Sequence, residues 1–189
     1  HKLVVADFSA IEARVIAWLA GETWVNEVFA THGRIYEATA SQMFGVPVER
    51  IVKGNPEYAL RQKGKVATLA LGYQGGTNAL IGMGALDMGL TEEELPDIVQ
   101  RWRQANPRIV DLWYAVGQAV MAAMQTGQAQ ATHGLMFTPE GDIVYGQAFL
   151  TIRLPSGRKL SYPRPYLAVN RFDRMALHYY GVDQHTKKW

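Results

Sequence analysis

The sequence predicts an α+β fold that is mostly α, with a long helical region inserted in a small antiparallel sheet. A short β-branched run, 2–7, opens the chain as a strand. Apolar residues then recur at helical spacing as far as Gly127, and short β-prone segments with hairpin-type turns follow. Strands on both sides of a helical block indicate a helical insertion that rises from a sheet.

Capping residues, glycines and prolines divide the helical block. Ser9 and Glu12 have the spacing of a capping box, and Gly21 ends the helix that they begin. Thr91 and Glu94 form a second capping box at the start of a helix to about residue 105. The other expected helices cover 24–30, 35–44, 56 to about 72 and 107 to about 127, and the expected strands cover 129–137, 142–146, 148–154 and 158–162.

Composition excludes several classes of protein. Of the 189 residues, 48% are hydrophobic and 19% are charged, which excludes intrinsic disorder. No apolar run approaches the ~20 residues of a membrane span, and no signal-peptide pattern opens the chain. Cysteine is absent, which excludes disulfides and thiolate metal sites and fits a cytoplasmic protein.

Charge is divided unevenly along the chain. Residues 1–149 carry a net charge of −4, and residues 150–189 carry a net charge of +6. A basic region can bind a polyanion such as nucleic acid, and it can equally be a solvated surface. The basic residues that could follow a template or primer backbone are Arg153, Arg158, Lys159, Arg164, Arg171 and Arg174.

Asp7 is the first candidate for chemistry. It ends the expected strand where the chain passes into a helix, so its carboxylate could project from a sheet edge and hold a divalent metal. Alternatively, Asp7 and Ser9 only cap the helix, and Glu12 is only the capping-box partner of Ser9. The local pattern alone favours the capping interpretation.

A stripe along the expected helix 56–73 is the second candidate. Arg61, Lys65, Leu69 and Tyr73 are four residues apart, so they follow one side of the helix over ~18 Å. Two cations could bind the phosphates of a triphosphate, and the apolar and aromatic side chains could pack against its sugar and base. The alternative is an ordinary amphipathic helix with a basic, solvated edge.

Taken together, the two candidates resemble family A DNA polymerases. The segment Asp7-Phe-Ser-Ala-Ile-Glu-Ala-Arg14 is similar to their motif A, Asp-Tyr-Ser-Gln-Ile-Glu-Leu-Arg. Arg61-Gln-Lys-Gly-Lys65, continued to Tyr73, resembles motif B of their fingers helix, and Ala38-Thr-Ala-Ser-Gln-Met-Phe-Gly-Val-Pro47 resembles the segment between the motifs. The amino-acid sequence of the chain is most similar to that of the phage or prophage branch of the family. The resemblance covers essentially the whole chain.

The resemblance implies a role for each candidate residue. Asp7 would be one of two metal-binding aspartates, with the Phe8 carbonyl as an auxiliary ligand, in a site for two Mg²⁺ ions. Glu12 would lie under the sugar and act as a gate against the 2′-hydroxyl of ribonucleotides. The residues that would bind the incoming deoxynucleoside triphosphate (dNTP) are Arg61, Lys65, Leu69, Tyr73 and, through a phosphate, Tyr36.

The sequence departs from the family pattern in three places. Leu69 replaces an aromatic residue that packs on the sugar, and Arg34 and Tyr36 replace an aspartate and a phosphate-binding histidine of bacterial members. The His-Asp-Glu of motif C, which carries the second metal aspartate, does not occur in the 189 residues. We therefore expect these 189 residues alone to have little or no polymerase activity.

The resemblance predicts three regions and a set of partners. The regions are a palm strand and helix with motif A at 1–22, helical fingers with motif B at 23–127, and a β-rich part of the palm at 128–189. The implied partners are a DNA template-primer, a dNTP and the remaining palm and thumb of a full-length polymerase, with no membrane. Three alternatives remain open: a single-subunit RNA polymerase relative, against which Glu12 argues, a non-catalytic nucleic-acid-binding module, and a decayed prophage remnant with no present function.

Overall fold

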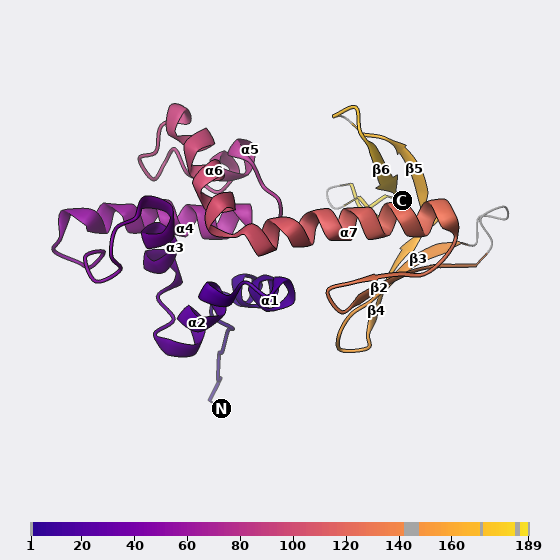
Figure 1. Ribbon diagram of the computed structural model, residues 1–189, viewed down its shortest axis with the longest axis horizontal. Helices are drawn as coiled ribbons and strands as arrows, with labels where there is room; N and C mark the ends of the chain where they lie inside the picture. The colour runs from indigo at the N-terminus through magenta and orange to yellow at the C-terminus, as the bar shows by residue number, and fades with distance from the viewer. Residues whose placement is uncertain (1, 142–147, 171, 184–185, 189) are drawn as a thin grey trace. The chain divides into compact units, whose positions relative to one another are not determined.

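The computed structural model describes residues 2–141, 148–170, 172–183 and 186–188 (Figure 1). Within them, seven α-helices, a four-stranded antiparallel sheet and a two-stranded one confirm an α+β fold that is mostly α. The chain forms two compact units, His1–Asp111 and Leu112–Trp189. The expected three-part division at residues 22 and 127 remains a prediction. In the described part of the chain, no helix has both the length and the apolar character needed to span a membrane.

The first unit is built from helices. Its elements are α1 (Ile11–Ala20), α2 (Thr23–Thr31), α3 (Ile35–Phe44), the 3₁₀ helix η1 (Pro56–Ala59), α4 (Leu60–Leu71), α5 (Thr77–Gly82), the 3₁₀ helix η2 (Glu92–Glu94), α6 (Leu95–Ala105) and the beginning of α7 (Pro107–Thr126). The helices begin and end close to the expected residues. The capping box of Thr91 and Glu94 is confirmed, and Pro56 opens η1, which leads directly into α4.

Helices α3 and α4 cross at very short range. A Cβ atom added to Gly64 would lie 2.2 Å from the carbonyl oxygen of Tyr36 and 2.9 Å from the backbone nitrogen of Ala40. One turn further along α4, the Thr68 hydroxyl donates to the Thr39 hydroxyl at 3.1 Å. The buried side chains of α4 therefore pack directly on α3, and the position of α3 fixes that of α4.

Helix α1 is placed by the turn that follows it. The Glu22 side chain is buried, and its carboxylate accepts a hydrogen bond from the Arg108 backbone N–H at 3.0 Å, in the first turn of α7. A carboxylate is favourable there because it meets the unpaired N–H groups at the positive end of the helix dipole. Next to it, Trp24 Nε1 donates to the Ala105 carbonyl at 2.8 Å. These two contacts hold the α1–α2 turn on the junction of α6 and α7.

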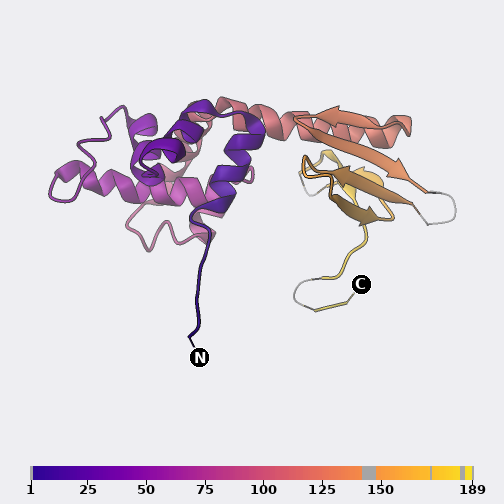
Figure 2. The same cartoon turned by 90° about the horizontal axis from the view of Figure 1, so that it is seen from below.

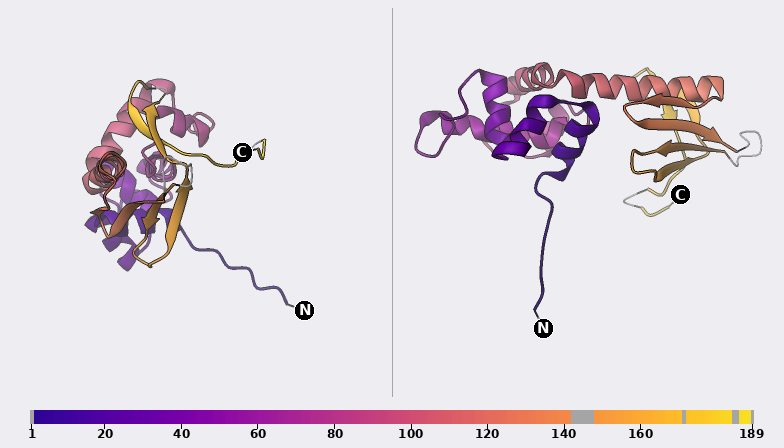
Figure 3. Two further views of the ribbon diagram at one scale, coloured as in Figure 1. Left: turned by 90° about the vertical axis from the view of Figure 1, so that its right-hand side faces the viewer. Right: turned by 60° about the horizontal axis from the view of Figure 1, so that its bottom comes forward.

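The second unit contains the two sheets (Figure 3). Strands β1 (Gln130–Thr132), β2 (Leu135–Glu140), β3 (Phe149–Arg153) and β4 (Lys159–Pro163) pair in that order, all antiparallel. The buried Phe137 and Leu150 form part of its core. The turn at 155–158 is confirmed, with the Leu154 N–H donating to the Arg158 carbonyl at 2.8 Å and Gly157 at φ 83°. Strands β5 (Tyr166–Val169) and β6 (Met175–His178) form a separate hairpin that the sequence analysis did not predict.

The structure corrects the expected strand at 2–7. These residues form no strand, and Figure 2 shows them as an extended trace that leads away from the helices of the first unit. Leu3, Val4 and Val5 are more than 90% exposed. A β-branched run gains little from an extended conformation until a neighbouring strand pairs with it, and no described strand does so. The predicted strand at 2–7 is therefore wrong: the segment has strand propensity, but no described strand pairs with it.

Two smaller predictions are also corrected. The capping box of Ser9 and Glu12 is not formed: Ala10 is the N-cap of α1, in a left-handed conformation with no side-chain cap, and the Ser9 carbonyl accepts from Arg14 Nε instead. The expected strand 129–137 is two strands, because a turn at His133 and Gly134, both with positive φ, reverses the chain. The expected strand 142–146 lies outside the described residues.

Replacing Gly64 by alanine tests the close crossing of α3 and α4. We expect Gly64→Ala to lower the free energy of unfolding by about 3 kcal/mol, at the upper end for overpacking, because the added methyl group meets backbone atoms that cannot rotate away. Chemical denaturation followed by circular dichroism measures this. The matched control is Gly82→Ala at the end of α5, where a Cβ atom meets nothing within 4 Å. Equal stability of the two variants would contradict the proposed packing.

Candidate functional site

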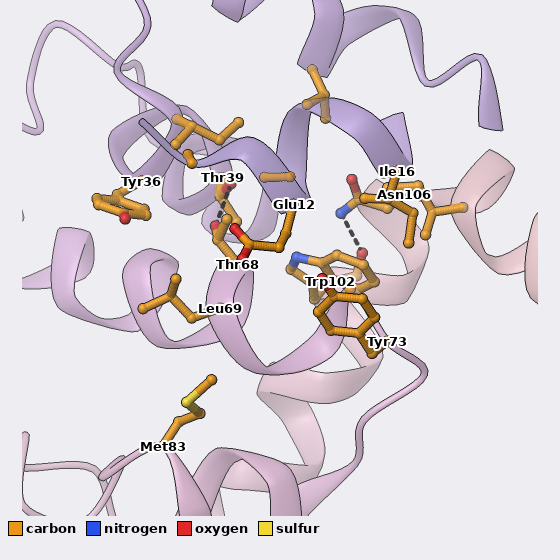
Figure 4. Close-up of a pocket in the computed structure, with 16 residues that line it drawn as sticks. Glu12, Ile16, Tyr36, Thr39, Thr68, Leu69, Tyr73, Met83, Trp102 and Asn106 are labelled. Carbon is orange, nitrogen blue, oxygen red and sulfur yellow. Dashed lines mark hydrogen bonds between the residues drawn. The ribbon is translucent and has the colours of Figure 1, made fainter. Parts of the chain in front are cut away.

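A cavity of about 170 Å³ lies within the first unit, among α1, α3, α4, α6 and α7 (Figure 4). Four residues singled out by the sequence analysis line it: Glu12, Tyr36, Leu69 and Tyr73. They come from segments up to about 60 residues apart in sequence, and the packing of α1 and α3 around α4 brings them together. The rest of the lining is mostly apolar, with Ile16, Val25, Ile35, Met83, Trp102 and Ile109 among its members.

Glu12 and Tyr73 both line this cavity. Glu12 points from α1 towards α4 in Figure 4, and Tyr73 follows the end of α4, two residues after Leu71. The pKa of the Tyr73 phenol is raised above its ordinary value, first by partial burial and second by the negative charge of Glu12. The Tyr73 side chain is nevertheless 71% exposed, so the ring borders the cavity rather than filling it.

Sequence reasoning missed the polar groups at the back of the cavity. Thr39 and Thr68, whose hydroxyls are hydrogen bonded to each other, line it, and so does Asn106, which donates to the Trp102 carbonyl at 2.8 Å. Trp102 is on α6 and Asn106 is the C-cap of that helix, four residues later, so their helical spacing was a possible signal. Thr39 and Thr68 are 29 residues apart, and only the crossing of α3 and α4 joins them.

The two cations of the α4 stripe lie outside the cavity lining. Arg61 and Lys65 are two turns and one turn before Leu69, about 12 Å and 6 Å along the helix. Arg61 is half-buried, and its Nε donates to the Glu37 carboxylate at 2.8 Å. Lys65 is half-buried and has no hydrogen-bond or ion-pair partner within residues 2–141, so its charge is not neutralised there.

The motif A metal ligands are not brought to this cavity. Asp7 is exposed and the Phe8 side chain is 79% exposed, since both precede α1 on the segment that forms no strand. No group of three or more Asp, Glu, His or Cys residues that could hold a metal ion occurs in the part of the chain that the structure describes. The described carboxylates therefore do not form a metal centre by themselves.

The basic residues of the second unit are exposed. Arg153 and Lys159 are directly opposite each other in β3 and β4 and so lie on one face of the sheet. Lys159 pairs with Glu140 at 2.6 Å, and this hydrogen bond, followed by one from Thr151, lowers the pKa of the Glu140 carboxyl. Arg164 lies over the Tyr180 ring at 5.4 Å. Arg158 and Arg174 are exposed, and Arg171 lies outside the described residues.

Comparison with known proteins identifies relatives that match all or part of the chain. No family model matches it. The chain is 56% identical over its full length to the DNA polymerase of Bacillus phage SP02. It is 34% identical over 59% of its length to DNA polymerase I of Rhizobium leguminosarum, and 30% identical over 57% to the thermostable DNA polymerase I of Thermus thermophilus.

The chain spans only part of each relative. It corresponds to 28% of the length of the phage polymerase, and to 10% and 12% of the two bacterial polymerases. The full-length match to a phage polymerase agrees with the expected resemblance to the phage branch. The matches to DNA polymerase I agree with the resemblance based on motifs A and B. These similarities support the resemblance to a fragment of a family A DNA polymerase.

Proposed function

We propose that the chain forms the dNTP-binding part of a DNA-directed DNA polymerase, which transfers nucleotidyl groups from dNTPs to a DNA primer during replication. The observation that carries this proposal is the cavity that Glu12, Tyr36, Leu69 and Tyr73 line together. Two cations, Arg61 and Lys65, precede Leu69 on α4. A largely apolar, partly open space beside a row of positive charge suits a ligand with an apolar end and an anionic end. A nucleoside triphosphate has this form.

The proposed site divides the nucleotide between the cavity and the helix. A cavity of about 170 Å³ is smaller than the usual site for a whole ligand, so it would receive only the sugar and base, against Leu69 and Tyr73. The phosphates would lie outside it along α4. Lys65 supplies an unneutralised ammonium group there, and Arg61 supplies a planar guanidinium suited to phosphate oxygens. Tyr36, whose ring lies 5.3 Å from the Arg61 guanidinium, borders both regions and is a further proposed phosphate contact.

Glu12 is the proposed sugar gate. Its carboxylate lies in the lining of the cavity, near enough to Tyr73 to raise the pKa of the phenol. A 2′-hydroxyl pointing at this pair would meet occupied space or leave a polar group without a good partner. The site would therefore favour deoxyribonucleotides, which argues against an RNA polymerase.

Nucleotidyl transfer by this family would use two Mg²⁺ ions, which activate the primer hydroxyl and stabilise the leaving pyrophosphate. In this chain, the Asp7 carboxylate and the Phe8 carbonyl are the proposed ligands. A two-ion centre needs further carboxylates, and the described residues provide no cluster that contains them. The donor set of the described residues is therefore insufficient for the centre, and we propose that the remaining palm completes it.

The proposed macromolecular partners are a template-primer and the rest of the polymerase. The exposed basic residues of the second unit have the charge to follow a phosphate backbone. The exposed apolar residues Leu3, Val4 and Val5 are available to pair with a strand of the remaining palm. The proposed location of the intact enzyme is the cytoplasm of a bacterial host cell.

Removing the free cation on α4 tests the binding site. We expect Lys65→Ala to weaken dATP binding roughly tenfold to a hundredfold, because a charge-assisted hydrogen bond contributes about 1.5–3 kcal/mol. Isothermal titration calorimetry measures the affinity. Lys63→Ala is the matched control: Lys63 is on the same helix, but it pairs with Glu94 at 2.5 Å. Equal losses in the two variants, or none in either, would argue against a phosphate site at Lys65.

Removing the Glu12 carboxylate tests the gate. Because the negative charge is the second cause of the raised phenol pKa, we expect Glu12→Ala to lower the pKa of Tyr73 towards 10.0 without fully restoring it, since partial burial remains. The preference for dATP over ATP should fall by roughly tenfold. A pH titration of the ¹³Cζ resonance of Tyr73, assigned with Tyr73→Phe, measures the first effect. Glu27→Ala, an exposed carboxylate on α2, is the control, and identical behaviour of the two variants would refute the gate.

The donor set predicts the outcome of a primer-extension assay. The 189 residues should give no template-dependent extension with Mg²⁺ and all four dNTPs, because they lack motif C and present no complete carboxylate cluster in the described residues. The assay needs a full-length relative as a positive control. Measurable extension by the purified chain would show that its residues complete a catalytic centre.

A further inference from the structure

The ion pair between Arg61 and Glu37 joins the two helices beside the cavity. Arg61 Nε donates to Glu37 Oε1 at 2.8 Å, and the side chains are only 30% and 14% exposed. The guanidinium also lies 5.3 Å from the Tyr36 ring and 5.9 Å from the Tyr58 ring. Three groups from α3 and η1 therefore surround one guanidinium, and each restricts its rotation.

The bonding of Arg61 is one-sided. The carboxylate is bound through Nε alone, whereas Nη1 and Nη2 have no hydrogen-bond partner within the described residues. The two terminal amino groups are the part of the guanidinium that can bind a phosphate with two parallel hydrogen bonds. Glu37 thus accepts from Nε, the nitrogen that is not needed when Nη1 and Nη2 bind a phosphate.

Glu37 is itself firmly placed. It lies on α3 next to Tyr36, and the Tyr36 carbonyl is the atom that a side chain at Gly64 would meet at 2.2 Å. The pair also joins α3 and α4 about one turn before this crossing, so the backbones that carry both partners are held by packed contacts. A fixed carboxylate in this position determines the direction in which the guanidinium points.

We propose that Glu37 is a positioning residue for nucleotide binding: it holds Arg61 through Nε so that Nη1 and Nη2 are already turned towards the phosphates. This inference rests on the proposed function, because it takes Arg61 to be a triphosphate ligand. A long side chain that is ordered before the ligand arrives loses less conformational freedom on binding. The carboxylate also offsets part of the positive charge of the site, but Lys65, one turn away and without a partner within residues 2–141, still provides attraction for the anion.

Two substitutions of Glu37 separate orientation from charge. Glu37→Gln removes the charge but keeps an oxygen that can accept from Nε, whereas Glu37→Ala removes both. We expect Glu37→Ala to weaken binding of dATP about three- to tenfold, as for the loss of one pre-ordered side chain, and Glu37→Gln to stay within about twofold of the wild type. Isothermal titration calorimetry with dATP measures both, and thermal unfolding confirms that the variants are folded.

A matched control and a double-mutant cycle exclude a general effect. Asp97 also accepts from an arginine Nε, that of Arg101 at 2.6 Å, in an exposed pair within α6, and Asp97→Ala should leave dATP binding unchanged. Arg61→Lys keeps the charge but has no Nε–H to be held. Glu37→Ala should therefore have no further effect on dATP binding in an Arg61→Lys background.

A measurement without ligand makes the inference independent of the affinities. In ¹H–¹⁵N spectra, the Arg61 Nε–H should be protected from exchange with water in the wild type and in Glu37→Gln, and should lose that protection in Glu37→Ala. Arg61→Lys alone should weaken dATP binding, and wild-type affinity in this variant would overturn the inference even if Glu37→Ala did not fold.

The outcomes distinguish this inference from the proposed function. Binding of dATP to Glu37→Ala that equals or exceeds that of the wild type would show that Glu37 competes with phosphate or has no part in binding, while the site itself stands. Failure of the folded wild type to bind dATP would contradict the proposed function, and the role of Glu37 with it.

Discussion

The close approach of α3 and α4 at Gly64 is the constraint on which the candidate site depends. Because Gly64 has no side chain, the α3 backbone passes where a Cβ atom would otherwise lie. Only at this separation can Glu37 reach Arg61 on one side of the crossing and Thr39 reach Thr68 on the other. The phosphate side and the sugar side of the proposed site are therefore set by a single backbone contact.

The second requirement is a fixed position for α1, which supplies Glu12. The buried Glu22 carboxylate and the Trp24 indole tie the turn after α1 to the junction of α6 and α7. Negative and positive charge therefore lie on different parts of the site. The Glu12 carboxylate is in the cavity lining, and the cations are nearer the beginning of α4. Such a separation gives a nucleotide one favourable orientation, with its sugar at Glu12 and its phosphates away from it.

Much of this arrangement could be predicted from the sequence, because helix periodicity and the capping box of Thr91 are local signals that the tertiary structure preserved. The spacing on α4 likewise predicted a common side for Arg61, Lys65 and Leu69. Contacts between distant segments could not be predicted: the Arg61–Glu37 pair depends on the glycine crossing, and the run 2–7 has strand propensity but no described partner. The two motif A residues therefore differ in position. Glu12, on α1, lines the cavity, whereas Asp7, which precedes α1, does not.

Chemical-shift mapping of the ¹⁵N-labelled chain with dATP tests the central claim most directly, because it reports which part of the molecule a nucleotide touches. We expect the largest shifts to cluster at Glu12, Tyr36, Lys65, Leu69 and Tyr73, and to saturate together with one affinity. Shifts confined to the basic strands of the second unit would identify a non-catalytic polyanion-binding surface instead. That result, or no saturable shift at all, would contradict a dNTP site built on α4.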